Sequence, residues 1–226
     1  MKISNETLNI LKNFSTINSS IFVRKGSTLS TISANKTVLA KAKITEDFPQ
    51  EFAIYDLNNF LTLTSLDKDD TELDFDEHHV LIKSLGGRSK IYYRFTDKSM
   101  IVIPPEKDIN FGNPDYTLTI AINDLDWIKK IVSLLDSPNV AIEGKEGNLS
   151  IVAFDIKNDA ANINSLTIGN TDKEFRAVFK AENLKLIPDS YTVEISSKGI
   201  AHFVNESDIL QYWIPLEKDG NKLWLS

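Results

Sequence analysis

Two stretches of this chain resemble each other closely enough to decide its fold: "LNILKNFSTINSSIFVRKGSTLSTIS" (8–33) and "LDWIKKIVSLLDSPNVAIEGKEGNLSIVA" (125–153). Each begins with apolar residues spaced three and four apart, which predicts an amphipathic helix, and continues with the alternating pattern of a hairpin. Such a repeat indicates two copies of one structural unit. The helical positions match at a constant offset of 117: Leu8, Leu11, Lys12, Phe14 and Ile17 correspond to Leu125, Ile128, Lys129, Ile131 and Leu134.

A weaker repeat follows each hairpin. "FAIYDLNNFLTL" (52–63) is similar to "FRAVFKAENLKLI" (175–187), and both are typical of a strand that runs into a helix. We therefore predict four short helices in a strand-rich chain, over roughly 4–16, 56–66, 124–136 and 181–187. The expected N-caps are Asp56 for the second helix and Asn123 or Asp124 for the third, whereas Pro188 ends the fourth. Turn residues indicate hairpins at Lys25-Gly26, at Gly86-Gly87 and within 144–148.

These elements predict an α+β protein made of two similar domains, with helices on one face and antiparallel sheets on the other. The stretch "IPPEKDINFGNPD" (103–115) holds three prolines and a glycine between the two copies, as expected for a linker. We accordingly place an N-terminal domain at 1–105, a linker at 106–114 and a C-terminal domain at 115–226.

The polar faces of the predicted helices carry several lysines. Lys12 and Lys129 occupy equivalent positions in the repeat, and Lys130 and Lys185 also point away from the apolar faces. Each lysine alone is typical of an ordinary solvated face, but together the four lysines outnumber Asp126 and Glu182 on these faces, and Asn, Ser and Thr supply the rest. Those side chains are donors that phosphate oxygens accept, without sequence information. On the apolar side of the third helix, Trp127 is expected to anchor the core.

The net charge of −7 does not exclude such a basic surface, because the charge is unevenly spread. The run "DKDDTELDFDE" (67–77) holds seven acidic residues and one lysine, so the rest of the chain is nearly neutral. Charges on separate faces are screened from one another by solvent. The run itself is interpreted as a solvated loop that leads into a strand, or as an element that a partner recognises.

Several classes of chemistry lack their residues. The chain has no cysteine, which excludes disulfides and thiolate metal sites and fits a reducing cytoplasm. No apolar stretch approaches the roughly 20 residues of a membrane span, and the start lacks a signal peptide's apolar region. His78 and His79 are adjacent, so on a strand they point to opposite faces and do not converge on a metal. The stretch "SLGGRSK" (84–90) lacks the spacing of a phosphate loop. We expect a non-enzymatic protein without cofactor or metal.

The sequence resembles one family through nearly its whole length: the DNA polymerase sliding clamps, or processivity factors, of T-even-type phages. The similar stretches are "LKNFSTINSSIF" (11–22), "AIYDLNNFLTLTSL" (53–66), "DLDWIKKIVSLL" (124–135), "VAIEGKEGNLSI" (140–151) and "YWIPLE" (212–217). "AIYDLNNFL" is the most specific of them.

The resemblance implies a homotrimeric ring that encircles duplex DNA, with helices around the hole and sheets on the outer wall. It implies partners as well: an ATP-dependent clamp loader, a replicative DNA polymerase that inserts a hydrophobic C-terminal peptide, and late-transcription factors. The place of action would be the cytoplasm of the infected bacterial host.

Carried over by position, the resemblance implies a set of DNA-facing residues and two candidate interface strands. The second helix departs from expectation, because its outward residues Asn58, Thr62 and Ser65 are uncharged. The DNA-facing residues are Lys2, Lys12, Lys129, Lys130 and Lys185, and the interface strands are 99–103, with Met100, Ile101 and Val102, and 175–180, with Phe175, Val178 and Phe179.

The alternative is a non-enzymatic, β-rich phage accessory or ligand-binding module, such as a carbohydrate binder. Such a module would present a concave site lined by aromatic residues. The aromatic residues of this chain lie mostly within core patterns, which disfavours the alternative.

Overall fold

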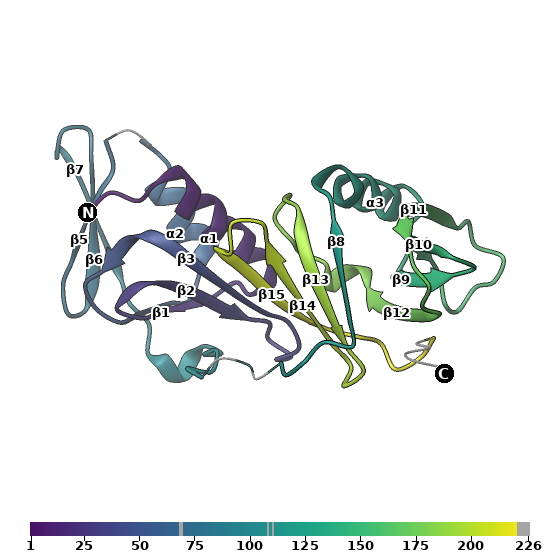
Figure 1. Ribbon diagram of the computed structural model, residues 1–226. Coiled ribbons are helices and arrows are strands. Elements are labelled where there is room, and N and C mark those ends of the chain that lie inside the picture. Colours follow the sequence, from purple (N-terminus) through teal and green to yellow (C-terminus); the bar gives the residue numbers. More distant parts are fainter. Residues whose placement is uncertain (68–69, 108, 110, 221–226) are drawn as a thin grey trace. The chain divides into compact units, whose positions relative to one another are not determined.

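The computed structural model describes residues 1–67, 70–107, 109 and 111–220. The chain forms two compact units, Met1–Asp108 and Ile109–Ser226, and each is described by itself. Both combine antiparallel strands with few helices (Figure 1).

Unit 1 begins with a helix and ends with a three-stranded meander. The strands β1 and β4 pair antiparallel, as do β2 and β3, whereas β5, β6 and β7 form a separate sheet in that order. The elements are α1 (Asn5–Ile17), β1 (Ile21–Val23), β2 (Gly26–Ile32), β3 (Leu39–Phe48), β4 (Phe52–Ile54), α2 (Leu57–Thr64), β5 (Glu72–Phe75), β6 (His79–Ser84), β7 (Ser89–Arg94) and the 3₁₀ turn η1 (Lys98–Met100).

Unit 2 repeats this plan with one long helix. Its first sheet has the order β11-β10-β9-β12, and β8 pairs with β13, which continues into β14 and β15. The elements are β8 (Tyr116–Ile120), α3 (Ile122–Leu134), β9 (Asn139–Lys145), β10 (Asn148–Phe154), β11 (Asn164–Asn170), β12 (Phe175–Lys180), the 3₁₀ turn η2 (Ala181–Asn183), β13 (Tyr191–Ser196), β14 (Ile200–Asn205) and β15 (Leu210–Pro215).

The predicted repeat is confirmed by strand pairing. The pairs β1–β4 and β2–β3 of unit 1 have their counterparts in β9–β12 and β10–β11, and each unit ends in a meander. Unit 1 also has a counterpart of the pairing between β8 and β13, because Met1 pairs with Leu73 of β5. The Met1 amino group donates to the Leu73 carbonyl at 2.6 Å, and the Leu73 N–H donates back to the Met1 carbonyl at 2.7 Å. The expected α+β fold of two similar domains is therefore correct.

The cores form where helices cover strands. In unit 1, α1 packs against α2 and β3 and buries Leu8, Leu11 and Phe14 completely or nearly so. In unit 2, α3 lies against β10 and β11, but only Leu125 and Ile128 of its residues are buried. This difference determines how many residues of α3 are exposed, because a helix with no second helix packed beside it buries less of its own surface.

Three details of the predicted secondary structure are wrong. The expected fourth helix at 181–187 is only the turn η2, because a segment this short that runs into Pro188 cannot sustain helical hydrogen bonds. The helix α3 begins two residues earlier than expected, with Ala121 as its N-cap and no capping side chain. Lys25-Gly26 does not join a paired hairpin, since β1 and β2 each pair with another strand. The Asp56 cap of α2 is confirmed, with its carboxylate accepting from the Asn59 N–H at 2.9 Å.

The described part of the acidic run has a structural role that its charge did not indicate. The carboxylates of Asp67 and Asp70 accept from the N–H groups of Leu85 and Gly86, in the β6–β7 turn. Leu85, Gly86 and Gly87 all have positive φ angles, and successive N–H groups in a turn can bind anions. The two acids therefore hold a hairpin in place, whereas positions 68 and 69 of the run lie outside the described residues.

The N-terminus of α1 is stabilised by a residue from a distant strand. Ser4 is the N-cap, and Glu46 of β3 accepts from the Ser4 N–H and the Thr7 hydroxyl. Burial, the largest single influence, raises the pKa of Glu46, but the hydrogen bonds from Ser4 and Thr7 together hold this pKa below its ordinary value. A negative charge here also suits the positive end of the helix dipole.

Replacing Glu46 with Gln is expected to lower the free energy of unfolding by about 1 kcal/mol at pH 7, the usual value of a helix cap. Because the pKa is lowered on folding, this contribution is fully present above the unfolded-state pKa and disappears as the pH falls through the folded-state pKa. Urea denaturation at pH 7 and at successively lower pH would measure it. The exposed Glu6→Gln is the control, and an equal loss in both variants would contradict the role of Glu46.

Candidate nucleic-acid interface

The exposed face of α1 is a straight polar stripe. Asn5, Asn9, Lys12 and Thr16 are all exposed, and their spacing of four, three and four residues places them on one line along the helix. All four side chains can donate hydrogen bonds, and one carries a positive charge. A surface of this composition can contact phosphate oxygens without reading base sequence.

The helix α3 presents a stripe with the same spacing. Asn123, Trp127, Lys130 and Leu134 are all exposed. Counted from the first residue of each helix, this stripe lies one residue later than the stripe of α1. The exposed counterpart of Lys12 is therefore Lys130, and not Lys129 as the sequence offset of 117 predicts.

Two predictions about α3 are wrong for the same reason. Trp127 was expected in the core, but its side chain is 49% exposed, and Leu134 is 78% exposed. The apolar residues of α3 cover a wide arc, and only its centre, at Leu125 and Ile128, is buried. The described residues of this unit form no second α-helix, and the edges of the arc face solvent.

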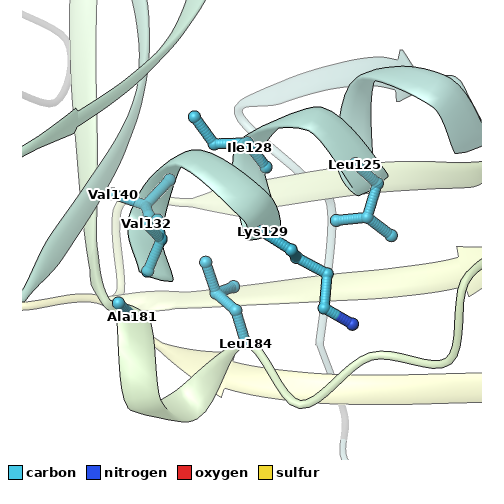
Figure 2. Close-up of a pocket in the computed structure, with 7 residues that line it drawn as sticks. All are labelled: Leu125, Ile128, Lys129, Val132, Val140, Ala181 and Leu184. Atoms are coloured by element: carbon cyan, nitrogen blue, oxygen red, sulfur yellow. The ribbon is translucent and has the colours of Figure 1, made fainter. Parts of the chain in front are cut away.

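Lys129 does not point outward. It is half-buried, and its Nζ donates to the Leu186 carbonyl at 2.7 Å. Burial lowers the pKa of Lys129, against a smaller opposite effect of Asp126. Figure 2 shows the Lys129 side chain extending from α3 beside Leu184. Both residues line a pocket of about 130 Å³. The prediction that Lys129 lies on the open polar face is thus wrong.

The remaining predicted DNA-facing lysines, Lys2 and Lys185, are exposed. Lys2 lies just before α1, and Lys185 lies in the segment that follows η2. On α2, Asn58 and Thr62 are exposed and uncharged, as expected. The structure thus leaves Lys2, Lys12, Lys130 and Lys185 as candidate phosphate contacts.

Of the two segments predicted as interface strands, only the second is a strand in the structure. Residues 99–103 do not form a strand: Met100 is the last residue of the turn η1 (Lys98–Met100), and Ile101 and Val102 follow it without strand pairing. The Asp97 carboxylate bonds the Ser99 N–H and hydroxyl, which favours a turn over an extended chain. Residues 175–180 do form an edge strand, β12, but the side chains of Phe175, Val178 and Phe179 are buried within the unit.

The structure also reveals edges that the sequence patterns did not single out. In the described part of the chain, β7 pairs only with β6, and β11 pairs only with β10. Tyr92 on β7 is 63% exposed, and Ile163 just before β11 is similarly open. Exposed tyrosine and isoleucine at unpaired strands could have flagged these edges, but only once the pairing order was known.

The described residues offer neither a cluster of metal ligands nor a membrane-spanning helix. Within the described ranges, no group of three His, Asp or Glu side chains is placed to hold a metal ion. His78 lies near Glu77, and His79 contacts the ring of Tyr92. No helix in that part of the chain is long and apolar enough to span a bilayer.

The fold is that of the DNA clamps. The chain is similar to the structure of A. fulgidus PCNA with the C-terminal region of FEN-1 bound, with a TM-score of 0.70 and 16% identity over 96% of this chain and 98% of that one. At that identity the likeness establishes the fold alone.

The family follows from the sequence comparisons. Residues 4–103 match the DNA polymerase processivity factor family, and residues 117–218 match the gp45 sliding clamp C-terminal family. The chain is 35% identical to the sliding clamp of Enterobacteria phage T4 over 97% of this chain and 98% of that one, and 31% identical to the sliding clamp of Vibrio phage KVP40 over 96% and 99%. The chain belongs to the phage sliding-clamp family, whose non-catalytic members are processivity factors for DNA polymerase. The expected family is thus confirmed, and the alternative of a ligand-binding accessory module is set aside.

The exposure of Trp127 predicts a small energetic role. Replacing Trp127 with Gln is expected to lower the free energy of unfolding by less than about 1 kcal/mol, because half of the side chain is already in water. Leu125→Ala, two residues earlier on the same helix, should cost about 2–5 kcal/mol. Thermal and urea denaturation would compare the two, and a larger loss for Trp127→Gln would contradict the exposed position.

Proposed function

We propose that this sliding clamp encircles duplex DNA as a homotrimeric ring, with the exposed stripes of α1 and α3 toward the DNA. The observation that supports this most is the matched position of Lys12 and Lys130, each within a line of exposed residues of the same spacing, although the line on α3 also holds the apolar Trp127 and Leu134. The family implies the DNA and the polymerase as partners. The relatives in phages T4 and KVP40 bear the same name of sliding clamp.

The small number of exposed lysines suits sliding. Each phosphate contact adds affinity that falls with salt, and many such contacts would hold the protein at one place on the duplex. A closed ring stays on DNA by topology, so its inner face needs only enough positive charge to admit the duplex. Lys2, Lys12, Lys130 and Lys185 supply this in a chain of net charge −7, whose remaining surface repels DNA.

For the subunit interface we propose the strands β7 and β11 in place of 99–103 and 175–180. Each has an unpaired edge in the described structure, and exposed apolar side chains accompany both. An edge of one unit that joins the edge of the other unit in a neighbouring chain is a head-to-tail contact, which closes into a ring. The strand β12 is a weaker candidate because the Val178 carbonyl already accepts from the Glu217 N–H at 2.8 Å.

The finer expectations rest on the family resemblance. We propose that an ATP-dependent loader opens the ring, that the replicative polymerase docks on the outer surface, and that late-transcription factors use the same clamp. The place of action is then the cytoplasm of the infected host. We keep 1–105 and 115–226 as the domains, with 106–114 as the linker, of which positions 108 and 110 lie outside the described residues.

A trimer makes a direct prediction. Light scattering during size exclusion at micromolar concentration should give three times the chain mass of 25.4 kDa. Tyr92→Asp should shift the protein toward monomer, because a charge at an apolar strand edge opposes pairing. Asp substitution of Tyr55, another exposed tyrosine, is the control. A monomeric wild-type protein would contradict the ring.

The lysine stripes make a second prediction. Changing Lys12 and Lys130 together to Met should weaken association with duplex DNA and lower its salt dependence by about one unit of log–log slope per lost contact, while the trimer stays intact. The matched control changes the exposed Lys36 and Lys157 to Met, with the same loss of charge. Equal effects of both pairs would assign the result to net charge and remove the stripes from DNA contact.

A further inference from the structure

The segment from Leu184 to Ile187 occupies in unit 2 the place along the chain that α2 occupies in unit 1, between a strand and the final meander. At its start the Leu184 N–H donates to the Ala181 carbonyl at 3.1 Å, and beyond this bond side chains hold its backbone. The Leu186 carbonyl accepts from Lys129 at 2.7 Å, the Ile187 carbonyl accepts from the Tyr191 hydroxyl at 2.7 Å, and the Ile187 N–H donates to the Tyr212 hydroxyl at 3.2 Å. Burial raises the pKa of both tyrosines, so their hydroxyls stay neutral.

Packing between α3 and this segment is incomplete. The pocket of about 130 Å³ lies between them and is lined by apolar residues and the stem of Lys129 (Figure 2). A void of this kind forfeits dispersion contacts that a second helix would make. The hydrogen bond from Lys129 to Leu186 is thus a direct polar link across a loosely filled space. Besides Lys129, the residues that line the pocket are Leu125, Ile128, Val132, Val140, Ala181 and Leu184.

We propose that Lys129 is a positioning residue, which fixes the 184–187 segment so that the neighbouring Lys185 is presented to DNA, and that it does not itself contact phosphate. This rests on the proposed function, because it assumes a DNA-facing Lys185. Lys185 is exposed and directly precedes the residue whose carbonyl Lys129 holds. For Lys129 to reach a phosphate, its ammonium would have to leave the Leu186 carbonyl, and a partly buried acceptor would lose its charged donor.

The lowered pKa of Lys129 agrees with this role, because burial and not an anion dominates its surroundings. The aliphatic stem of Lys129 is also held in place, since it lines the pocket beside Leu184. The neighbouring Lys130 is exposed and serves as the matched comparison on the same helix.

Hydrogen exchange on the full-length protein tests the link. In Lys129→Met, the Ile187 amide should exchange about tenfold faster, the factor expected for the loss of one hydrogen bond from a charged donor. Lys129→Arg should restore slow exchange, and Lys130→Met should leave it unchanged. Unchanged exchange at Ile187 in Lys129→Met would overturn the inference.

A double-mutant cycle tests the consequence for DNA. Fluorescence anisotropy with a labelled duplex, from about 50 to 200 mM KCl, gives the affinity and the salt slope. Lys185→Met should lower the slope by about one, and Lys129→Met should add nothing in the Lys185→Met background. Additive losses, with a slope lower by about two in the double variant, would show direct phosphate contact by Lys129 and overturn the inference.

The two proposals fail in distinguishable ways. If Lys130→Met and Lys185→Met both leave DNA binding unchanged, the DNA-facing assignment fails, and the positioning role fails with it. If these variants weaken DNA binding while the exchange rate of the Ile187 amide is unchanged in Lys129→Met, only the positioning role is wrong.

Discussion

The structure depends on one arrangement made twice: an amphipathic helix buries its apolar face against antiparallel strands and leaves its polar face open. In unit 1 the burial is nearly complete, with Phe14 fully inside and α2 packed beside α1. In unit 2 it is narrower, with Leu125 and Ile128 at its centre. Burial of each large apolar side chain contributes about 1.5–3 kcal/mol, so the helix orientation is set by the core and not by the polar residues. The exposed positions of Lys12 and Lys130 follow from that constraint.

This constraint also explains how an acidic protein can approach DNA. The helix cores decide which residues face outward. The outward line of α1 holds amides, a hydroxyl and one lysine, whereas that of α3 holds one amide and one lysine beside the apolar Trp127 and Leu134. Much of the negative charge lies elsewhere, and Asp67, Asp70 and Asp74 are engaged with the β6–β7 turn and with Lys83. Electrostatic attraction to DNA is thus confined to a few exposed lysines, and a ring that slides along DNA needs little more positive charge than this.

The sequence predicted the repeat because apolar spacing records the helix core directly. The matches of Leu8 with Leu125 and of Leu11 with Ile128 both lie at buried positions. It could not predict which lysine of α3 is exposed. A shift of one residue turns a helix face by about 100°, and the width of the buried arc depends on whether a second helix lies beside it. In place of a helix at 181–187 the structure has only the turn η2, and on α3 Trp127 is exposed while Lys129 donates to the Leu186 carbonyl.

The interface edges escaped prediction for a related reason. Whether a strand lies at an edge is a property of pairing order, which β7 and β11 show only in three dimensions. The stretch 99–103 is apolar enough for a strand, yet Asp97 bonds to Ser99 and begins a turn. Local side-chain hydrogen bonds of this kind compete with extended structure and are not visible in hydrophobic alternation.

Covalent closure of the ring on circular DNA tests the central claim most directly. The chain has no cysteine, so single cysteines placed on β7 and β11 can be joined across each subunit contact by a bifunctional maleimide. After loading onto a nicked circular plasmid, the linked protein should remain with the DNA through denaturing detergent and should be released when the plasmid is cut once. Loss of the linked trimer from the intact circle in detergent would contradict a ring that encircles the duplex.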